Sequence, residues 1–168
     1  MHTTFVDMSE SHRLGALQRL EILGTARETP YDRLVYVLAQ AFRAPIAVVT
    51  FVDADSVWVK AQVGLGDAEA LRTRAMCRET IRSDQPLIIE DLAEVDRFRE
   101  HEDGEPGLRF YAGVALAAPD GSRVGTLSVL DHKRHLVTVA QCALLVALGA
   151  DGCELLAMRA ASLAARRP

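Results

Sequence analysis

Two strand–turn–strand units constrain the fold of this chain more than any other feature. The run Ile46–Val52 is almost continuously apolar and rich in β-branched residues, as in a central strand covered on both faces. A turn follows, and residues 57–63 then alternate between apolar and polar side chains, as a half-buried strand does. Phe110–Ala117 and residues 123–130 form a second pair, joined by a Pro-Asp-Gly turn. Strands joined by tight turns pair antiparallel, so we expect an antiparallel sheet.

Helical periodicity flanks these strands. Leucines recur at helical spacing over residues 14–23, and residues 31–42 carry a second apolar stripe. Thr138 can cap a long helix that runs to about residue 164. A short helix over 74–82 and a short strand over 86–89 lie between the two strand pairs. The expected architecture is α+β, a sheet of about five or six strands with helices packed against it.

The length of 168 residues fits one domain. We place its core at about residues 30–137, with terminal helices at about 12–24 and 138–164. A formal net charge of -4 argues against general binding to nucleic acid or anionic membranes, which favours a basic surplus.

The location of the protein is predicted from its termini and cysteines. Residues 1–11 lack the basic-then-apolar pattern of a secretory signal. The longest apolar stretch, residues 139–157, is interrupted by Gln141, Asp151 and Glu154, which argues against a membrane span. No Cys-x-x-Cys pair is present, so neither a zinc ribbon nor a thioredoxin-like centre is indicated. We therefore expect a cytoplasmic protein.

A series of short motifs resembles bacterial GAF domains of the type found ahead of histidine kinases and diguanylate cyclases. In chain order they are PIAVVTFVD from Pro45, WVK from Trp58, VGL from Val63, MCRETI from Met76, PLIIED from Pro86, RFYAG from Arg109 and GTLSVLD from Gly125. The resemblance covers about residues 14–156. It implies a GAF/PAS-like fold, a small-molecule pocket on one face of the sheet, a sensory role without catalysis, and dimerisation through terminal helices.

Departures from the family pattern bear on the ligand. The Asn-Lys-Phe-Asp-Glu pattern of cyclic-nucleotide-binding members is not recognisable, and Cys77 is followed by Arg78 where bilin-binding members have histidine. Ala115 stands where the family often has proline. Both specific ligands are therefore disfavoured, and the sequence identifies no cofactor.

Candidate ligand-binding residues lie in the motifs that resemble the family. In a strand, Phe110 and Tyr111 point to opposite faces, so one should enter the core and the other a pocket or the helical layer. A lone tryptophan on the first hairpin is either a helix-facing anchor or a pocket wall. The full set of candidates is Trp58, Cys77, Asp91, Arg109, Phe110 and Tyr111.

Cys77 has two interpretations. Neighbouring arginines would favour the thiolate of a redox sensor or a pocket-wall residue, whereas a helix face shared with Ile81 favours a small buried side chain. We favour the buried one. A cysteine-based enzyme like free methionine sulfoxide reductase is the weaker alternative, because Cys142 and Cys153 fall on the C-terminal helix.

Two other groups of polar residues are interpreted as surface. Arg74, Arg78 and Arg82 recur every four residues and could hold a phosphate or carboxylate, but a solvated helix face is the preferred interpretation. Histidines at 101, 132 and 135 lack partners at a recognised metal-binding spacing, so we expect no metal site.

The C-terminal helix is apolar around most of its circumference, so it needs burial on more than one side. We expect a homodimer through a bundle of both terminal helices; the alternative is that these helices cover each other within one chain. The irregular segment 92–107 is the expected lid of a pocket. The chain would then be a free-standing sensor signalling to a partner protein in trans, with a ligand-free interaction module as the alternative.

Overall fold

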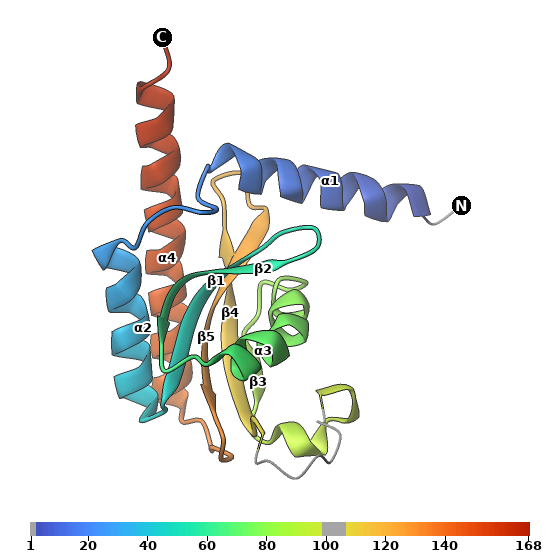
Figure 1. Ribbon diagram of the computed structural model, residues 1–168, viewed down its shortest axis with the longest axis vertical. Coiled ribbons are helices and arrows are strands. Elements are labelled where there is room, and N and C mark those ends of the chain that lie inside the picture. Colours follow the sequence, from blue (N-terminus) through green and yellow to red (C-terminus); the bar gives the residue numbers. More distant parts are fainter. Residues whose placement is uncertain (1–2, 99–106) are drawn as a thin grey trace.

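The computed structural model, which describes residues 3–98 and 107–168, consists of one antiparallel sheet with helices on both faces (Figure 1). Helices α2 and α4 cover one face, α3 covers the other, and α1 lies across one end of the sheet. The elements are α1 (Thr3–Arg19), α2 (Thr29–Phe42), β1 (Ile46–Val52), β2 (Val57–Val63), α3 (Asp67–Thr80), β3 (Leu87–Ile89), η1 (Leu92–Glu94), η2 (Asp96–Phe98), β4 (Phe110–Ala117), β5 (Arg123–Asp131) and α4 (Val139–Ala165).

The sheet has five strands in the order β2-β1-β5-β4-β3, and all neighbours pair antiparallel. Both predicted strand pairs are present, and the two pairs meet where β1 pairs with β5. The α+β prediction is confirmed. Because β1, β4 and β5 are interior strands, each is buried on both faces, which explains their nearly continuous apolar sequence.

The face beneath α2 and α4 is a closed apolar core. It is built by alternate residues of the strands, among them Val49, Phe51 and Leu127. Burial of side chains of this size contributes about 1.5–3 kcal/mol each to the free energy of unfolding. Helix α4 sits very close to β4 at Gly149, where an added Cβ would lie 2.6 Å from Val114 Cγ2. This contact explains a glycine in the interior of a helix.

A β-bulge in β2 breaks the predicted alternation of that strand. Thr50 pairs with Val59 and Val49 with Ala61, so Lys60 is the extra residue. Its ammonium group is buried, where it contacts Glu28 at 2.6 Å and donates to Thr25 and to the carbonyl of Ala26. The simple period-two pattern was therefore wrong at Lys60.

Helix boundaries differ from the sequence prediction at two places. The first helix begins by residue 3 and ends at Arg19, because Glu21 and Gly24 both have positive φ and belong to the turn that follows. Helix α3 begins at Asp67, earlier than predicted, with Asp67 and Glu69 in its first turn, where acidic side chains interact favourably with the helix dipole. The sequence of α3 is mostly polar, so apolar periodicity does not predict that the helix begins at Asp67. By contrast, Thr138 caps α4 as predicted, in a capping box with Gln141.

Helix α4 is long and apolar enough to cross a membrane by length and composition alone. Its buried residues form one stripe that faces β4 and α2, among them Leu145, Leu148 and Leu156. A core helix of a soluble domain has the same properties, so this finding is weak evidence for a membrane span.

Candidate functional site

The face of the sheet beneath α3 carries buried polar side chains, unlike the opposite face. Strand alternation places Thr50, Thr126 and Ser128 on this face, next to Tyr111. Helix α3 brings Cys77 and Thr80 down onto them. We call these six residues the α3-face polar cluster; each is at most 1 % exposed: Thr50, Cys77, Thr80, Tyr111, Thr126 and Ser128.

Hydrogen bonds organise the cluster into two groups. The hydroxyls of Thr50 and Thr126 lie 2.6 Å apart, and each lies 3.5 Å from Cys77 Sγ. The Thr80 hydroxyl lies 2.6 Å from the Tyr111 hydroxyl and also donates to the carbonyl of Met76. Both groups tie α3 to the sheet through hydrogen bonds, in addition to apolar packing of Met76 in a cluster with Ile46, Val48 and Leu130.

The cluster is electrically neutral at physiological pH. Burial raises the pKa of the Cys77 thiol, and burial raises the pKa of Tyr111 well above its ordinary value. Neither group is therefore an ionised nucleophile at neutral pH. Neutral hydroxyls can donate and accept hydrogen bonds, so the chemistry available here is recognition of uncharged polar groups.

Ser128 has a buried hydroxyl with no hydrogen-bond partner among the described residues. Its side chain lies in β5 opposite Gly113, under the α3 layer. An unpaired buried hydroxyl costs free energy, so native structures satisfy nearly all of them. The Tyr111 hydroxyl lies near enough for the Ser128 side chain to lower the pKa of Tyr111 against the larger effect of burial, so Ser128 belongs to the same cluster but forms no well-aligned hydrogen bond in it.

A small cavity of about 130 Å³ opens at the edge of this face. Met76 of α3, Leu92 and Leu108 form its floor, and Arg97 and Phe98 of η2 lie at its margin. Drug-sized ligand pockets occupy about 300–1,000 Å³. A ligand of that size therefore needs α3 or the η1–η2 segment to move.

Asp91 and Arg109 form an ion pair at the rim of the same face. Two parallel hydrogen bonds of 2.7 Å join the guanidinium to the carboxylate. The hydrogen bond from Arg109 lowers the pKa of Asp91 to about 2. Asp91 also accepts from the backbone N–H of Ala93 and caps η1, so the pair fixes the start of the η1–η2 segment to β4.

The six predicted ligand-binding residues do not lie together: two are in the α3-face polar cluster, two are at its rim and two pack on the opposite face of the sheet. Cys77 and Tyr111 meet in the α3-face polar cluster, and Asp91 and Arg109 pair at its rim. Phe110 lies on the opposite face, where its ring packs against Phe42 and His135. Half-buried Trp58 also packs on that core, stacked on Phe51. A contact of either aromatic with a ligand of the α3 face is not supported by this placement.

Four of the five hydroxyl-bearing members of the cluster were not predicted from the sequence: Thr50, Thr80, Thr126 and Ser128. Three of them could have been found from the strand sequences. Thr126 and Ser128 occupy alternate positions of the apolar strand β5 and so fall on one face, and Thr50 is the polar residue of the apolar strand β1.

The histidines near the start of α4 pair with carboxylates. His132 lies 3.2 Å from Glu69 and His135 lies 2.5 Å from Asp131. Among the residues that the structure describes, no group of three metal-binding side chains comes together. The predicted surface histidine at 101 lies outside the described residues.

Comparison with known sequences now places the fold. Residues 26–151 match the family profile described as the GAF domain. The chain belongs to the GAF domain family. A cyclic di-GMP phosphodiesterase of Pseudomonas aeruginosa is 28 % identical over 126 residues, which are 74 % of this chain. The match spans 22 % of that relative's length.

Solved structures show the same fold at low sequence identity. A domain of a putative two-component sensor histidine kinase from Sinorhizobium meliloti has a TM-score of 0.65 at 17 % identity, covering 86 % of this chain and all of that one. The GAF domain of an Acinetobacter phosphoenolpyruvate-protein phosphotransferase has a TM-score of 0.59 at 17 % identity, covering 100 % of this chain and 99 % of that one. Free methionine-R-sulfoxide reductase from Neisseria meningitidis has a TM-score of 0.62 at 14 % identity, with 88 % of each chain covered. At these identities the comparisons establish the fold and no activity.

Proposed function

We propose that this GAF domain is a cytoplasmic sensory module that binds a small polar molecule on the α3 face of its sheet. Binding would favour one arrangement of α3 and the η1–η2 segment, and the terminal helices would report that arrangement to a partner protein in trans. The module itself would not catalyse a reaction.

The α3-face polar cluster is the observation that carries this proposal. The α3 face has an apolar part that includes Ile46, Val48 and Leu130, but a face that served only to stabilise the fold would not need the buried hydroxyls beside it. Here six buried polar residues gather under one helix, and the Ser128 hydroxyl has no partner among the described residues. The protein has already removed this hydroxyl from water, so a ligand that formed a hydrogen bond with it would not have to displace water from it.

The segment after β3 is the proposed lid. The predicted lid ran over residues 92–107, of which 99–106 lie outside the described residues. Over 92–98 the chain forms two short 3₁₀ helices, which pack beside the small cavity. Such short elements have few backbone hydrogen bonds to break, so displacing them costs less than displacing a strand.

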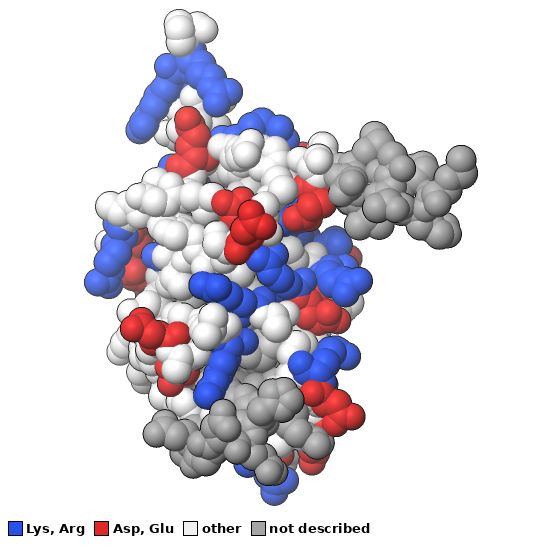
Figure 2. All heavy atoms as spheres, turned by 45° about the vertical axis from the view of Figure 1, so that its right-hand side comes forward, with Lys and Arg blue, Asp and Glu red and all other residues white. Residues whose placement is uncertain are grey.

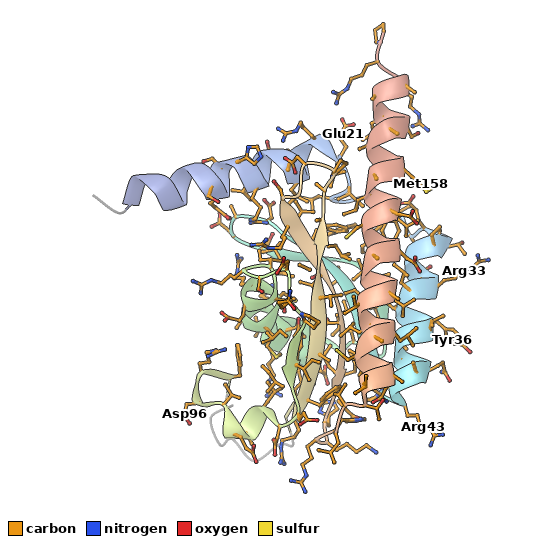
Figure 3. The ribbon with its side chains drawn as sticks, turned by 180° about the vertical axis from the view of Figure 1, so that it is seen from behind. Glu21, Arg33, Tyr36, Arg43, Asp96 and Met158 are labelled. Carbon is orange, nitrogen blue, oxygen red and sulfur yellow. The ribbon has the colours of Figure 1, made fainter. Side chains whose placement is uncertain are left out.

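A second copy of the chain is the proposed partner of α4. Only 28 % of the apolar 18-residue stretch of α4 is buried, and Val139, Val146 and Met158 are exposed. In Figure 3, no other helix lies over the outer face of α4, and its C-terminal part extends past the sheet. Residues spaced alternately four and three apart line this face, as in a coiled-coil seam. They are Val139, Ala143, Val146, Ala150 and Ala157, whereas Cys153, the remaining position of this spacing, packs on the core and accepts from the N–H of Ala117.

The comparisons support signalling as the general role. The related proteins named above include a sensor histidine kinase and a cyclic di-GMP phosphodiesterase. In the latter the matched segment is a minor part of the whole, as expected if such a domain controls an activity that resides elsewhere.

Native mass spectrometry of freshly purified protein tests the proposal. A dimer that retains a stoichiometric small-molecule adduct is the expected result, and the adduct mass would characterise the ligand. A ligand-free dimer would favour an interaction module, which the small size of the cavity also favours. A ligand-free monomer would contradict both parts of the proposal.

Val146→Glu tests the dimer seam. A buried, unpaired carboxylate in the seam should dissociate the dimer. The matched control is Leu71→Glu, because Leu71 is 63 % exposed on α3 and lies outside the seam. Equal dissociation by both variants, or by neither, would contradict the seam.

Thiol labelling tests the cysteine-enzyme alternative. Cys77 is fully buried, and Cys142 and Cys153 lie on α4, beyond the opposite face of the sheet. We expect Cys142 and Cys153 to react with a water-soluble disulfide reagent first, and Cys77 only on unfolding. Rapid labelling of Cys77 in the native protein would favour redox chemistry at that residue.

A further inference from the structure

A second hollow of the molecule, separate from the α3-face polar cluster, is lined mainly by arginine. This cleft has a volume of about 510 Å³ and lies between α1, the end of α3 and the start of β5. We call it the arginine cleft. Among residues whose side chains the structure describes, its charged lining consists of four arginines and one glutamate: Arg13, Arg78, Arg82, Arg123 and Glu10.

Two of the arginines are held in place by backbone carbonyls. Arg13 is 9 % exposed and donates to the carbonyl of Val52 at 2.7 Å, which fastens α1 to the end of β1. Arg123 donates to the carbonyls of Ile81 at 2.6 Å and Arg82 at 3.2 Å, which fastens β5 to the turn after α3. Carbonyl contacts orient a guanidinium without neutralising it, and they leave other N–H groups available.

The positive charge in the cleft exceeds the negative charge. Glu10 is bound by Arg13 through two hydrogen bonds of 2.8 and 2.7 Å, and the hydrogen bond from Arg13 lowers the pKa of Glu10. Arg82 reaches Glu79 only at 3.6 Å, a contact that Glu79 also makes with Arg97. Within the described chain Arg78 and Arg123 donate to backbone carbonyls, and the charge of Arg78 contributes to the lowered pKa of Glu10.

Arg74 and Arg82 are exposed, in line with the predicted solvated face, but the structure adds partners to the arginine stripe. The sequence suggested a solvated face of Arg74, Arg78 and Arg82 on one helix. Helix α3 ends at Thr80, so Arg82 lies in the turn that follows, and both it and Arg78 face the cleft with arginines from α1 and β5. Figure 2, which brings the side carrying α3 forward, shows basic side chains across the middle of this surface.

We propose that the arginine cleft binds a small anion that carries two phosphate groups. Guanidinium groups bind phosphate oxygens through paired hydrogen bonds, and a surplus of about three positive charges matches a diphosphate better than a single carboxylate. The volume lies within the range of small-molecule sites. Among the described residues the lining contains no aromatic ring, so the recognition we propose rests on the phosphates and not on stacking of a base.

An adjoining hollow of about 290 Å³ could hold the part of the ligand that carries no phosphate. It shares Ser9, Arg13, Ile81 and Arg123 with the cleft and extends towards Ser122. At its far end Asp120 pairs with His12 at 3.0 Å and Arg19 at 3.6 Å, so a carboxylate already occupies the basic groups there. A diphosphate is therefore directed towards Arg78, Arg82 and Arg123.

A diphosphate in this cleft connects parts of the chain that are far apart in sequence. It would contact α1, the end of α3 and β5 at once, so binding would hold the N-terminal helix against the sheet. The site is separate from the ligand site under α3, and its failure would leave that proposal intact.

Isothermal titration calorimetry with inorganic pyrophosphate tests the assignment. The wild-type protein should bind pyrophosphate saturably at one site per chain, and orthophosphate at least about tenfold more weakly. Arg78→Gln and Arg82→Gln should each weaken pyrophosphate binding by about tenfold. Arg33→Gln is the matched control, because Arg33 is exposed on α2 and points away from the body of the molecule (Figure 3).

Three results would overturn the proposal. These are no saturable binding at millimolar pyrophosphate, equal affinity for orthophosphate, or equal weakening by Arg33→Gln and the two cleft variants. Arg82 is 78 % exposed at its side chain, so its variant is expected to fold, and circular dichroism on each variant verifies this.

Discussion

The two faces of the sheet are built from the same strands and yet differ in chemistry. Beneath α2 and α4, alternate residues of β1, β4 and β5 are apolar and pack against the two helices. Beneath α3, the intervening residues of the same strands include hydroxyls beside apolar side chains, and this single helix covers them through Met76, a thiol and a hydroxyl. The α3 face thus combines apolar packing with buried polar groups, and these polar groups are available for recognition.

The largest difference between the faces should appear when an aromatic side chain is removed from the apolar one. Phe110 is fully buried and contacts Phe42 and His135. Phe110→Ala should lower the free energy of unfolding by about 3–5 kcal/mol, since it loses apolar burial and leaves a cavity. Urea denaturation followed by circular dichroism measures this. A loss below about 1 kcal/mol would show that this face is not a closely packed core.

Its neighbour in sequence, Tyr111, points to the other face and should respond less when its hydroxyl is removed. Tyr111→Phe keeps the ring and loses the hydrogen bond with Thr80, which retains its bond to Met76. We expect a loss of about 0.5–1.5 kcal/mol in the same denaturation experiment. A loss as large as that of Phe110→Ala would remove the proposed distinction between the faces.

The ion pair at the rim should give a smaller, pH-dependent effect. The pKa of Asp91 in the folded state is about 2, below its ordinary value of 3.8, so the unfolded chain binds the proton first as the pH falls. The contribution of the pair is thus fully present above about pH 4 and lost towards pH 2. Asp91→Asn should lower the urea midpoint slightly at pH 7 and leave it equal to that of wild type near pH 2. A difference that stays constant across this range would contradict the assignment.

The smallest effect is expected at the unpaired hydroxyl. Ser128→Ala removes a group with no hydrogen-bond partner among the described residues, so stability should stay within about 0.5 kcal/mol of wild type or rise. If the hydroxyl serves a ligand, the same variant should reduce retention of the small-molecule adduct in native mass spectrometry. A marked loss of stability without any effect on the adduct would indicate a structural hydroxyl.

The sequence predicts the apolar half of this molecule better than the polar half. The strand pairs of β1 with β2 and β4 with β5, the cap of α4 at Thr138 and the stripe of α2 follow from periodicity and turn chemistry, which act locally. The α3-face polar cluster draws on four separate elements, so its hydrogen bonds depend on sheet order, which no local pattern encodes. The bulge at Lys60 and the early start of α3 were missed because each departs from a simple period.

The candidate site was predicted in part for the same reason. Motif resemblance found Cys77, Tyr111, Asp91 and Arg109, but it could not tell which face each strand residue occupies. Phe110 and Trp58 were therefore grouped with residues on the opposite side of the sheet. The arginine cleft was interpreted as a solvated helix face, because Arg13 and Arg123 approach Arg78 only in the folded chain.

Residue-resolved hydrogen–deuterium exchange of the purified protein tests the comparison of the two faces most directly. If the α3 face is the one that opens for a ligand, amides of α3, β3 and the η1–η2 segment should exchange much faster than those of α2, β1 and β5. If a bound small molecule slowed amide exchange in these segments alone, the result would further support a ligand site on the α3 face. Equal protection on both faces of the sheet would contradict it.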